Sequence, residues 1–169
     1  MVKQGIVLGH IISSKGNEVD KAKVDLISNL PPPKTVREVR TFLRHAGFYR
    51  RFIKDFHKIS RPLCNLLTKD VPFVFYDSCH VAFEKLKQLL ISSPIIQPLN
   101  WSLPFEFMCD ASDYALEAVL GHRVDRIPHV IYYASITLND AQLNYSTIEK
   151  EMLAVVFVLR DISILSHWL

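Results

Sequence analysis

Alternating apolar and polar residues in the second half of the chain predict three β-strands, at residues 105–110, 115–120 and 129–135. Turn-forming or polar residues separate these runs, first Ala-Ser-Asp and then residues 121–128. Strands this close in sequence are expected to form an antiparallel meander.

A helical period follows the third strand. Apolar residues recur at intervals of three and four, at Ile148, Met152, Val155, Val156 and Leu159. This spacing predicts an amphipathic helix that buries this apolar face against the meander.

The first part of the chain is predicted to be a hairpin followed by a helix. Residues 6–13 have the composition of a strand arm, with residues 14–17 as the turn. A short helix is expected at residues 20–29. The three prolines at residues 31–33 predict a stiff extended break and a subdomain hinge.

A longer helix is predicted at residues 35–51, because Thr35 to Glu38 have the pattern of a capping box. Its apolar side consists of Val36, Val39, Leu43 and Ala46.

A packing helix is expected after an extended segment at residues 72–75. Asp77 is its candidate N-cap, and it ends before Ser93 and Pro94. Its apolar residues are Val81, Ala82, Phe83, Leu86, Leu89 and Leu90. Residues 94–103 are interpreted as a linker.

Composition and charge narrow the class of protein. Of the 169 residues, 49% are hydrophobic and 22% charged, which is too apolar for a disordered chain. The net charge of +3 is unevenly distributed. Residues 34–69 hold ten Lys or Arg against two acids, a net +8 that leaves −5 on the rest of the chain. Such a local excess is typical of a surface that contacts a nucleic-acid backbone.

Arginines of the longer helix are expected to share one side of it. They recur at intervals of three, four and seven residues, at Arg37, Arg40, Arg44 and Arg51. Phe48 and Tyr49 interleave with them. From the residues alone, this is either a solvated basic face with core aromatics, or a surface on which arginines hold phosphates and aromatic rings pack against sugars or bases.

The cysteine pattern and the hydropathy indicate the cellular compartment in which the protein is expected. Cys64, Cys79 and Cys109 show neither an even count nor CxxC spacing, which predicts reduced thiols in an intracellular protein. No apolar run approaches a membrane span, and the N-terminus lacks a signal-peptide pattern. We therefore expect a protein that is not secreted and has no membrane partner.

Two acidic residues are candidate metal ligands. Asp110 ends the first strand of the meander, and Glu151 lies in the early turns of the last helix. Such carboxylates could bind one Mg²⁺ ion together. Mg²⁺ takes few protein ligands, and water and phosphate oxygens fill its remaining coordination positions. The alternative is that each is a solvated surface acid. Glu149 is expected to have a structural role instead, because Ser146 to Glu149 form a capping box.

Several sequence motifs resemble those of one family. They are Cys-Asp-Ala-Ser-Asp-Tyr-Ala (109–115), Ala-Val-Leu-Gly (118–121), Tyr-Ala-Ser (133–135) and Asn-Tyr-Ser-Thr-Ile-Glu-Lys-Glu-Met-Leu-Ala-Val-Val (144–156). In this order they closely resemble the reverse transcriptase–ribonuclease H polyprotein (Pol) of Ty3/gypsy-type LTR retrotransposons, particularly plant copies. The resemblance continues back to residue 1.

The resemblance implies roles for the candidate sites. In that family the Asp of Asp-Ala-Ser and the second Glu of Glu-Lys-Glu are catalytic ligands of Mg²⁺, or of Mn²⁺, in the ribonuclease H site, and they fall on Asp110 and Glu151. The Leu-Gly-His segment resembles the primer grip, and the basic helix resembles the polymerase thumb, which grips the template–primer. The expected nucleic-acid contacts are therefore Gly9, His10, Arg37, Arg40, Arg44, Phe48 and Arg51.

The resemblance also implies an α+β (α/β) fold. A helical thumb and connection segment would precede a truncated RNase H-like fold, formed by a three-stranded antiparallel meander plus one helix. We assign residues 1–30 to the end of the reverse transcriptase palm, 31–93 to thumb and connection, 94–103 to a linker and 104–169 to the RNase H-like domain.

The metal site is expected to be incomplete. The family's third carboxylate would follow Leu169, and the Asp-Asp motif of the palm would precede residue 1. Asp161 is a weak substitute, because it lies roughly 15 Å along the helix from Glu151. Without the family's next strand, residues 104–110 would form an open edge that invites self-association.

Three residues depart from the family pattern. Arg44 stands where Gly is usual after Phe42-Leu43, Glu117 stands where a strand Gly is favoured, and Ile136 stands where Arg is usual. Arg44 adds charge and bulk where Gly would allow close approach to a duplex, so hybrid binding is expected to be altered.

From the sequence we expect a fragment of a retrotransposon reverse transcriptase/ribonuclease H. The family's activities are RNA-directed DNA synthesis and Mg²⁺-dependent hydrolysis of RNA in RNA–DNA hybrids, and this truncated chain is expected to be inactive. Its expected partners are an RNA–DNA hybrid or template–primer duplex and the remaining Pol segments, in a cytoplasmic particle or the nucleus. The alternative is a non-catalytic nucleic-acid-binding remnant that uses the basic helix.

Overall fold

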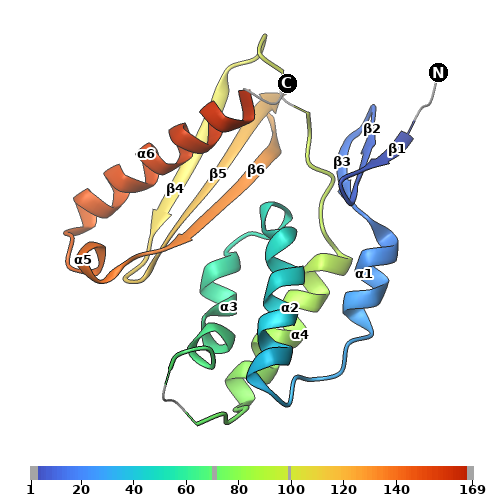
Figure 1. Ribbon diagram of the computed structural model, residues 1–169. Helices are drawn as coiled ribbons and strands as arrows, with labels where there is room; N and C mark the ends of the chain where they lie inside the picture. The colour runs from blue at the N-terminus through green and yellow to red at the C-terminus, as the bar shows by residue number, and fades with distance from the viewer. Residues whose placement is uncertain (1–3, 70–71, 99, 167–169) are drawn as a thin grey trace. The chain divides into compact units, whose positions relative to one another are not determined.

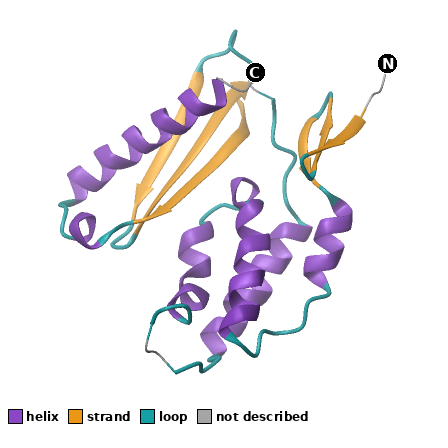
Figure 2. Ribbon diagram, in the orientation of Figure 1, coloured by secondary structure: helices purple, strands orange, loops and turns teal. Residues whose placement is uncertain are grey.

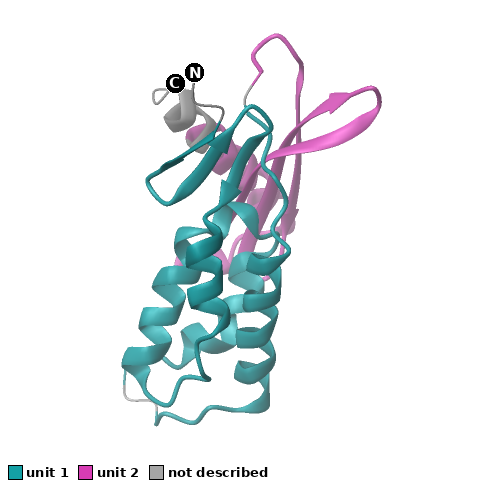
Figure 3. Ribbon diagram, turned by 90° about the vertical axis from the view of Figure 1, so that its right-hand side faces the viewer, with its two compact units in different colours: residues 1–98 teal, residues 99–169 magenta. Residues whose placement is uncertain are grey.

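The computed structural model describes residues 4–69, 72–98 and 100–166, with side chains described up to residue 160. The chain divides into two compact units, Met1–Pro98 and Leu99–Leu169 (Figure 3). Both combine helices with a three-stranded antiparallel sheet, which confirms the α+β class (Figure 2). The boundary falls inside the predicted linker.

Unit 1 begins with three short strands and continues as helices (Figure 1). Its elements are β1 (Gln4–Val7), β2 (His10–Ser13), β3 (Gly16–Val19), α1 (Lys21–Ser28), α2 (Val36–Phe48), the 3-10 helix η1 (Arg50–Phe52), α3 (Phe56–Asn65) and α4 (Asp77–Ile91).

The strand arm predicted at residues 6–13 is two strands joined by a tight turn, so that prediction was wrong in its topology. Val7 pairs with His10, and the two residues between them, Leu8 and Gly9, both have positive φ, 48° and 75°. This is the backbone that two-residue hairpin turns require, and Gly9 adopts it at little cost. The turn predicted at residues 14–17 is present between β2 and β3, but it is shorter, because Gly16 and Asn17 already pair with β2.

The first two helices begin as predicted. The Asp20 side chain accepts a hydrogen bond from the Ala22 amide (3.1 Å), and Thr35 Oγ1 accepts one from the Glu38 amide (3.2 Å). Helix α2 ends at Phe48, however, and a separate 3-10 turn follows, so the predicted end at residue 51 was wrong.

Two features of the other helices differ from expectation. Helix α3 was not predicted, and Pro62 lies inside it. Helix α4 begins at Asp77 itself with Tyr76 at the N-cap position, and Val81 on α4 is 69% exposed rather than packed.

The core of unit 1 joins its sheet to its helices. Phe42 of α2 and Phe83 of α4 are buried, with their ring centroids 4.5 Å apart. Val19 of β3 and Ile27 of α1 belong to the same cluster. Ile96 is also buried there, because its amide and carbonyl pair with those of Asn17 at 2.9 and 2.8 Å.

Unit 2 is a meander with one face covered by a helix (Figures 1 and 2). Its elements are β4 (Phe105–Ala111), β5 (Ala115–Val124), β6 (Ile127–Thr137), α5 (Asp140–Leu143) and α6 (Thr147–Ser166). The strands are longer than predicted. Residues 121–128 were expected to separate them, but the turn is confined to Asp125 and Arg126, both with positive φ.

Helix α6 turns a different face to the sheet from the one predicted. Ile148, Met152, Val156 and Leu159 are 54–73% exposed, whereas Ala154 and Val158 are buried over β5 and β6. Apolar residues run almost all the way round this helix, so their period alone could not identify the packed face. The small Ala154 lets the helix lie close to Leu116 and Leu138.

Strand β4 lies at the edge of its sheet. Within the described residues it pairs with β5 along one side, in the order β4-β5-β6. No strand among the described residues pairs with its other side, and both the open edge and self-association through it stay predictions.

Candidate nucleic-acid interface and carboxylate site

Three of the four arginines predicted to share a basic face lie on α2. The fourth, Arg51, lies beyond its end in η1 and is partly buried, so its placement on that face was wrong. Arg37, Arg40 and Arg44 are all exposed, on the side opposite the buried Val39 and Ala46. The ion pairs found among the described residues involve other cations, Lys87 with Glu84 and Arg123 with Glu106. The positive charge of the α2 face therefore has no direct ion-pair partner within the described part of the chain.

The hairpin turn is anchored on an aromatic group at the end of α2. The His10 ring centroid lies 5.1, 5.6 and 5.7 Å from those of Phe48, Tyr49 and Phe52. The Tyr49 hydroxyl donates to the Gly9 carbonyl (3.0 Å), and His10 Nδ1 lies 3.1 Å from the Leu8 carbonyl. The structure thus brings together Gly9, His10 and Phe48, three of the predicted contacts.

The two aromatic residues named in the prediction have different positions. Phe48 is 52% exposed and can present its ring to a ligand, whereas Tyr49 is 3% exposed. The expectation that Tyr49 packs against sugars or bases was wrong, because its ring and hydroxyl hold the hairpin. The hydrogen bond to Gly9 spans 40 residues, and no local sequence signal indicated it.

The surroundings of His10 favour the neutral form of its imidazole. Burial and the positive charge of Arg51 lower the pKa of its imidazole, and a hydrogen bond with the Leu8 carbonyl acts in the opposite direction. Its Nε2 is buried without a hydrogen-bond partner among the described residues. At neutral pH the positive charge beside Phe48 therefore comes from arginine, with Arg51 partly buried.

Replacing Tyr49 by Phe should loosen the hairpin turn. The change leaves the Gly9 carbonyl without its donor, at a cost of about 1 kcal/mol. We expect faster amide hydrogen exchange in the turn and hybrid binding weaker by a few-fold. Tyr76→Phe is the matched control, since Tyr76 is 63% exposed. Equal exchange in both variants would contradict an anchoring role.

His57 makes unit 1 sensitive to acid. Burial, with a contribution from the Arg50 charge, lowers the pKa of His57 to about 4. The unfolded chain, with a histidine pKa near 6.5, binds more protons between these values, so the stability contributed by His57 is present above about pH 6.5 and lost as pH falls towards 4. We expect a loss of about 1 kcal/mol between pH 7 and 5, after a discount for partial exposure. Urea unfolding of wild type and His57→Gln should show a smaller loss in the variant, and equal losses would refute the assignment.

Asp110 lies near the end of β4, on the sheet face turned away from α6. Its neighbour Cys109 packs in the clusters that contain Ala154 and Val158, and successive strand residues point to opposite faces. Next along the chain, Ser112 closes the turn through its amide and hydroxyl, which lie 2.9 and 2.8 Å from the Ala115 carbonyl. The Ser of the Asp-Ala-Ser motif therefore fixes the strand end that carries Asp110.

Glu117 shares that face with Asp110. The two residues are directly paired across β4 and β5, and Glu117 is paired with Ser135 on β6. Ser135 Oγ donates to Glu117 Oε1 (3.1 Å), and Glu117 is 7% exposed. A residue noted in the sequence only as a departure from the family pattern is therefore a buried acid beside the candidate ligand.

Glu151 is exposed on α6, as is Asp110 on β4. The two elements pack against each other, and the end of β4 and the start of α6 lie at the same end of the unit (Figure 1). A metal ion bound by both carboxylates would have to lie beside β4, the strand at the edge of the sheet. The structure does not bring the two carboxylates together on one face, so their pairing stays a prediction.

The assignment of Glu149 to the helix start is confirmed. Its Oε2 accepts hydrogen bonds from the amide and hydroxyl of Ser146, both at 2.8 Å. These bonds hold the pKa of Glu149 below its ordinary value. Within the described residues, no group of three or more His, Cys, Asp or Glu could hold a metal ion. The Asp161 side chain lies outside the described residues.

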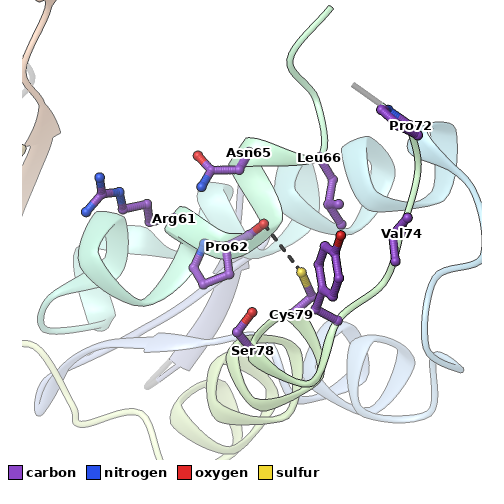
Figure 4. A pocket seen from close by; sticks show the side chains of 9 residues that line it. Arg61, Pro62, Asn65, Leu66, Pro72, Val74, Ser78 and Cys79 are labelled. Atoms are coloured by element: carbon purple, nitrogen blue, oxygen red, sulfur yellow. Dashed lines mark hydrogen bonds between the residues drawn. The ribbon is translucent and has the colours of Figure 1, made fainter. Parts of the chain in front are cut away.

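A pocket of about 340 Å³ opens between α3, α4 and the segment that joins them (Figure 4). Its lining residues include Arg61, Asn65, Tyr76 and Cys79, and Cys79 Sγ donates to the Pro62 carbonyl (3.5 Å). None of the predicted site residues lines it, and it contains no convergent set of titratable groups, so we assign it no role.

Comparison with known proteins identifies the family. Residues 75–166 match the family model described as "RNase H-like domain found in reverse transcriptase". The chain belongs to this family. It is 36% identical over 166 residues to the retrovirus-related Pol polyprotein from transposon opus and 39% identical over 159 residues to that from transposon 297, both of Drosophila melanogaster. It is 37% identical over 163 residues to the transposon Tf2-3 polyprotein of Schizosaccharomyces pombe.

These matches cover 92–95% of this RNase H-like chain but 12–17% of the relatives, so it spans about a sixth or less of their length. The fold is similar to that of foamy viral protease-reverse transcriptase in complex with an RNA/DNA hybrid, with a TM-score of 0.80, 20% identity and coverage of 94% of this chain and 22% of the other. The same viral protein in complex with dsDNA gives the same TM-score and identity, with coverage of 98% and 35%. The resemblance to retrotransposon Pol polyproteins is thereby confirmed.

Among the described residues of this RNase H-like chain, no helix combines the length and the hydropathy needed to cross a bilayer.

Proposed function

We propose that this chain is the thumb, connection and leading part of the RNase H-like domain of a Ty3/gypsy-type Pol polyprotein of the plant-like subgroup, and that it binds an RNA–DNA hybrid or template–primer duplex. The observation that carries the proposal is the exposed arginine face of α2 beside Phe48 and the anchored hairpin turn.

The chemistry of this surface suits a nucleic-acid backbone. Guanidinium groups that form no ion pair with the described residues can each neutralise a phosphate and release its counterions. The half-exposed Phe48 ring offers a stacking surface, and the Gly9 turn lets the backbone come close to a ligand. The solved foamy viral reverse transcriptases of similar fold are complexes with an RNA/DNA hybrid and with dsDNA, which agrees with this proposal.

A second function, hydrolysis of the RNA strand, is favoured by the exposure of Asp110, near the end of β4, and of Glu151, near the start of α6. The end of β4 and the start of α6 lie at the same end of unit 2 (Figure 1). Two carboxylates fit Mg²⁺ or Mn²⁺ in part, because Mg²⁺ is commonly bound by one or two carboxylates with water and substrate phosphate. The bound ion would activate water and stabilise the leaving oxygen. In this proposal Asp110 and Glu151 are the residues that hold it, and water and the substrate phosphate would supply its other ligands.

We also propose the setting in which these functions operate. The remaining Pol segments are the expected covalent partners, and the reduced thiols of Cys64, Cys79 and Cys109 agree with an intracellular particle or the nucleus. Within the described residues β4 pairs along one side only, which supports self-association through its other side.

The test is a titration of a labelled RNA–DNA hybrid with the whole chain at several salt concentrations, followed by incubation in Mg²⁺ and in Mn²⁺ beside Asp110→Asn. Binding that weakens steeply with salt supports the first function, and salt-independent or absent binding refutes it. Cleavage that is lost in Asp110→Asn supports the second function. Cleavage that persists in the variant refutes the assignment of Asp110. No cleavage by a chain that binds refutes the second function for this chain and leaves the first.

A further inference from the structure

A buried histidine, His122 on β5, ties the first residues of unit 2 to the sheet. It is 3% exposed. Its Nε2 lies 3.1 Å from the amide nitrogen of Asn100, and its Nδ1 lies 3.1 Å from the carbonyl oxygen of Pro104. One ring nitrogen thus faces a donor and the other faces an acceptor. Only a neutral imidazole with its proton on Nδ1 satisfies both.

The residues held in this way form a compact loop, residues 100–104. Asn100 organises it, because its side-chain oxygen accepts from the Ser102 amide (3.0 Å) and its carbonyl accepts from the Leu103 amide (3.2 Å). Trp101 packs edge-on against Phe105, and the Phe105 ring lies 4.7 Å from that of His122. The imidazole therefore connects both ends of the loop to β5.

We propose that His122 is a pH-sensitive clamp, which fixes the loop at residues 100–104 to β5 when neutral and releases it when protonated. A proton taken from water by Nε2 turns the ring into an imidazolium, which donates at both nitrogens and accepts at neither. The Asn100 amide then loses its acceptor and faces another N–H group, while the bond to Pro104 remains. Both the lost bond and the repulsion favour opening of the loop at Asn100.

The charged groups around His122 do not oppose this response. Phe105 and Pro104 on the β4 side carry no charge. On β6 the residue directly opposite is His129, which brings no negative charge to the site. The next residues, Arg123 and Glu106, neutralise each other through a bidentate pair with 2.9 and 3.0 Å contacts. Among the described residues, no carboxylate forms an ion pair with His122 to hold an imidazolium in place.

The consequence concerns the connection between the two units. The loop begins two residues after Pro98, the last residue of unit 1, so its release adds free chain length to the linker. The clamp goes beyond the proposed nucleic-acid binding and does not depend on it, because every contact that forms it lies within unit 2.

Amide hydrogen exchange of the whole chain tests the clamp near pH 7.5 and near pH 5, after correction for intrinsic rates. We expect the protection of the Asn100 amide to fall about tenfold or more at the lower pH, while amides in the middle of β5 and β6 stay protected. In His122→Gln, which cannot gain a proton in this range, the protection should not change with pH. His129→Gln, the matched control, should keep the wild-type response.

Three results would overturn the clamp. The first is equal protection of Asn100 at both pH values in the wild-type chain. The second is the same pH response in His122→Gln as in wild type, which would assign the effect to another group. The third is a parallel loss of protection across β5 and β6, because the response would then be global unfolding.

Discussion

Replacing Arg37, Arg40 and Arg44 of α2 together by Gln is expected to weaken binding of an RNA–DNA hybrid by about 100-fold near physiological salt. Each of these exposed guanidinium groups can neutralise one phosphate. Each neutralised phosphate releases counterions and contributes close to one unit to the slope of log affinity against log salt concentration. The triple variant should therefore lose roughly three units of that slope, a readout that a merely destabilised protein would not show.

The control for this experiment removes three positive charges from surfaces outside the α2 face. Lys21 and Lys23 on α1 and Lys85 on α4 are exposed, and the triple change of these lysines to Gln lowers the net charge equally. We expect a small loss of affinity, because only the long-range attraction changes. Fluorescence anisotropy with one labelled hybrid measures both variants. Equal losses in the two would mean that total charge, and not the α2 face, determines binding.

The arginine face could be predicted from sequence because one helix carries both of its signals. The apolar positions Val39 and Ala46 place one side of α2 in the core, so arginines out of phase with them must be exposed. The capping box at Ser146 was likewise correct, since it joins residues three positions apart. At Thr35 the N-cap is present, but Glu38 accepts from the Lys34 amide and not from the Thr35 amide, so only half of that box forms.

Features that depend on distant residues could not be predicted in this way. The Tyr49 hydroxyl donates to the carbonyl of Gly9, 40 residues away, and so anchors the hairpin. Because no local pattern indicates this contact, the sequence suggested that the Tyr49 ring faces a ligand. The packed face of α6 was misjudged because its apolar residues fit several faces, and small size at Ala154 decided among them. Asp110 was correctly placed near a strand end, but the face it occupies depends on register across β4 and β5.

Truncating Phe83 to Ala is expected to destabilise unit 1 by about 3–5 kcal/mol. Phe83 is fully buried between α2 and α4, in contact with the Phe42 ring, and the Lys87 ammonium lies 4.7 Å from its ring centroid while it donates to the Leu30 carbonyl (3.0 Å). The change leaves a cavity. It also removes the ring that supports Lys87, whose hydrogen bond to Leu30 connects α4 to the end of α1. A domain of this size has a total stability on the order of 5–15 kcal/mol, so the loss is a large part of it.

The same variant should also lose hybrid affinity, because α2 rests on Phe83 through Phe42. Val81→Ala is the matched control on the same helix, since Val81 is 69% exposed and its truncation should change stability by about 0.5 kcal/mol or less. Urea unfolding followed by exchange of α2 and α4 amides separates this effect from unit 2, where β5 and β6 amides should be unchanged. Similar unfolding midpoints for the two variants would show that the α2–α4 contact does not support unit 1. A loss of β5 and β6 protection in Phe83→Ala would show instead that the two units unfold together, and the basic face would then depend on the RNase H-like part for its stability.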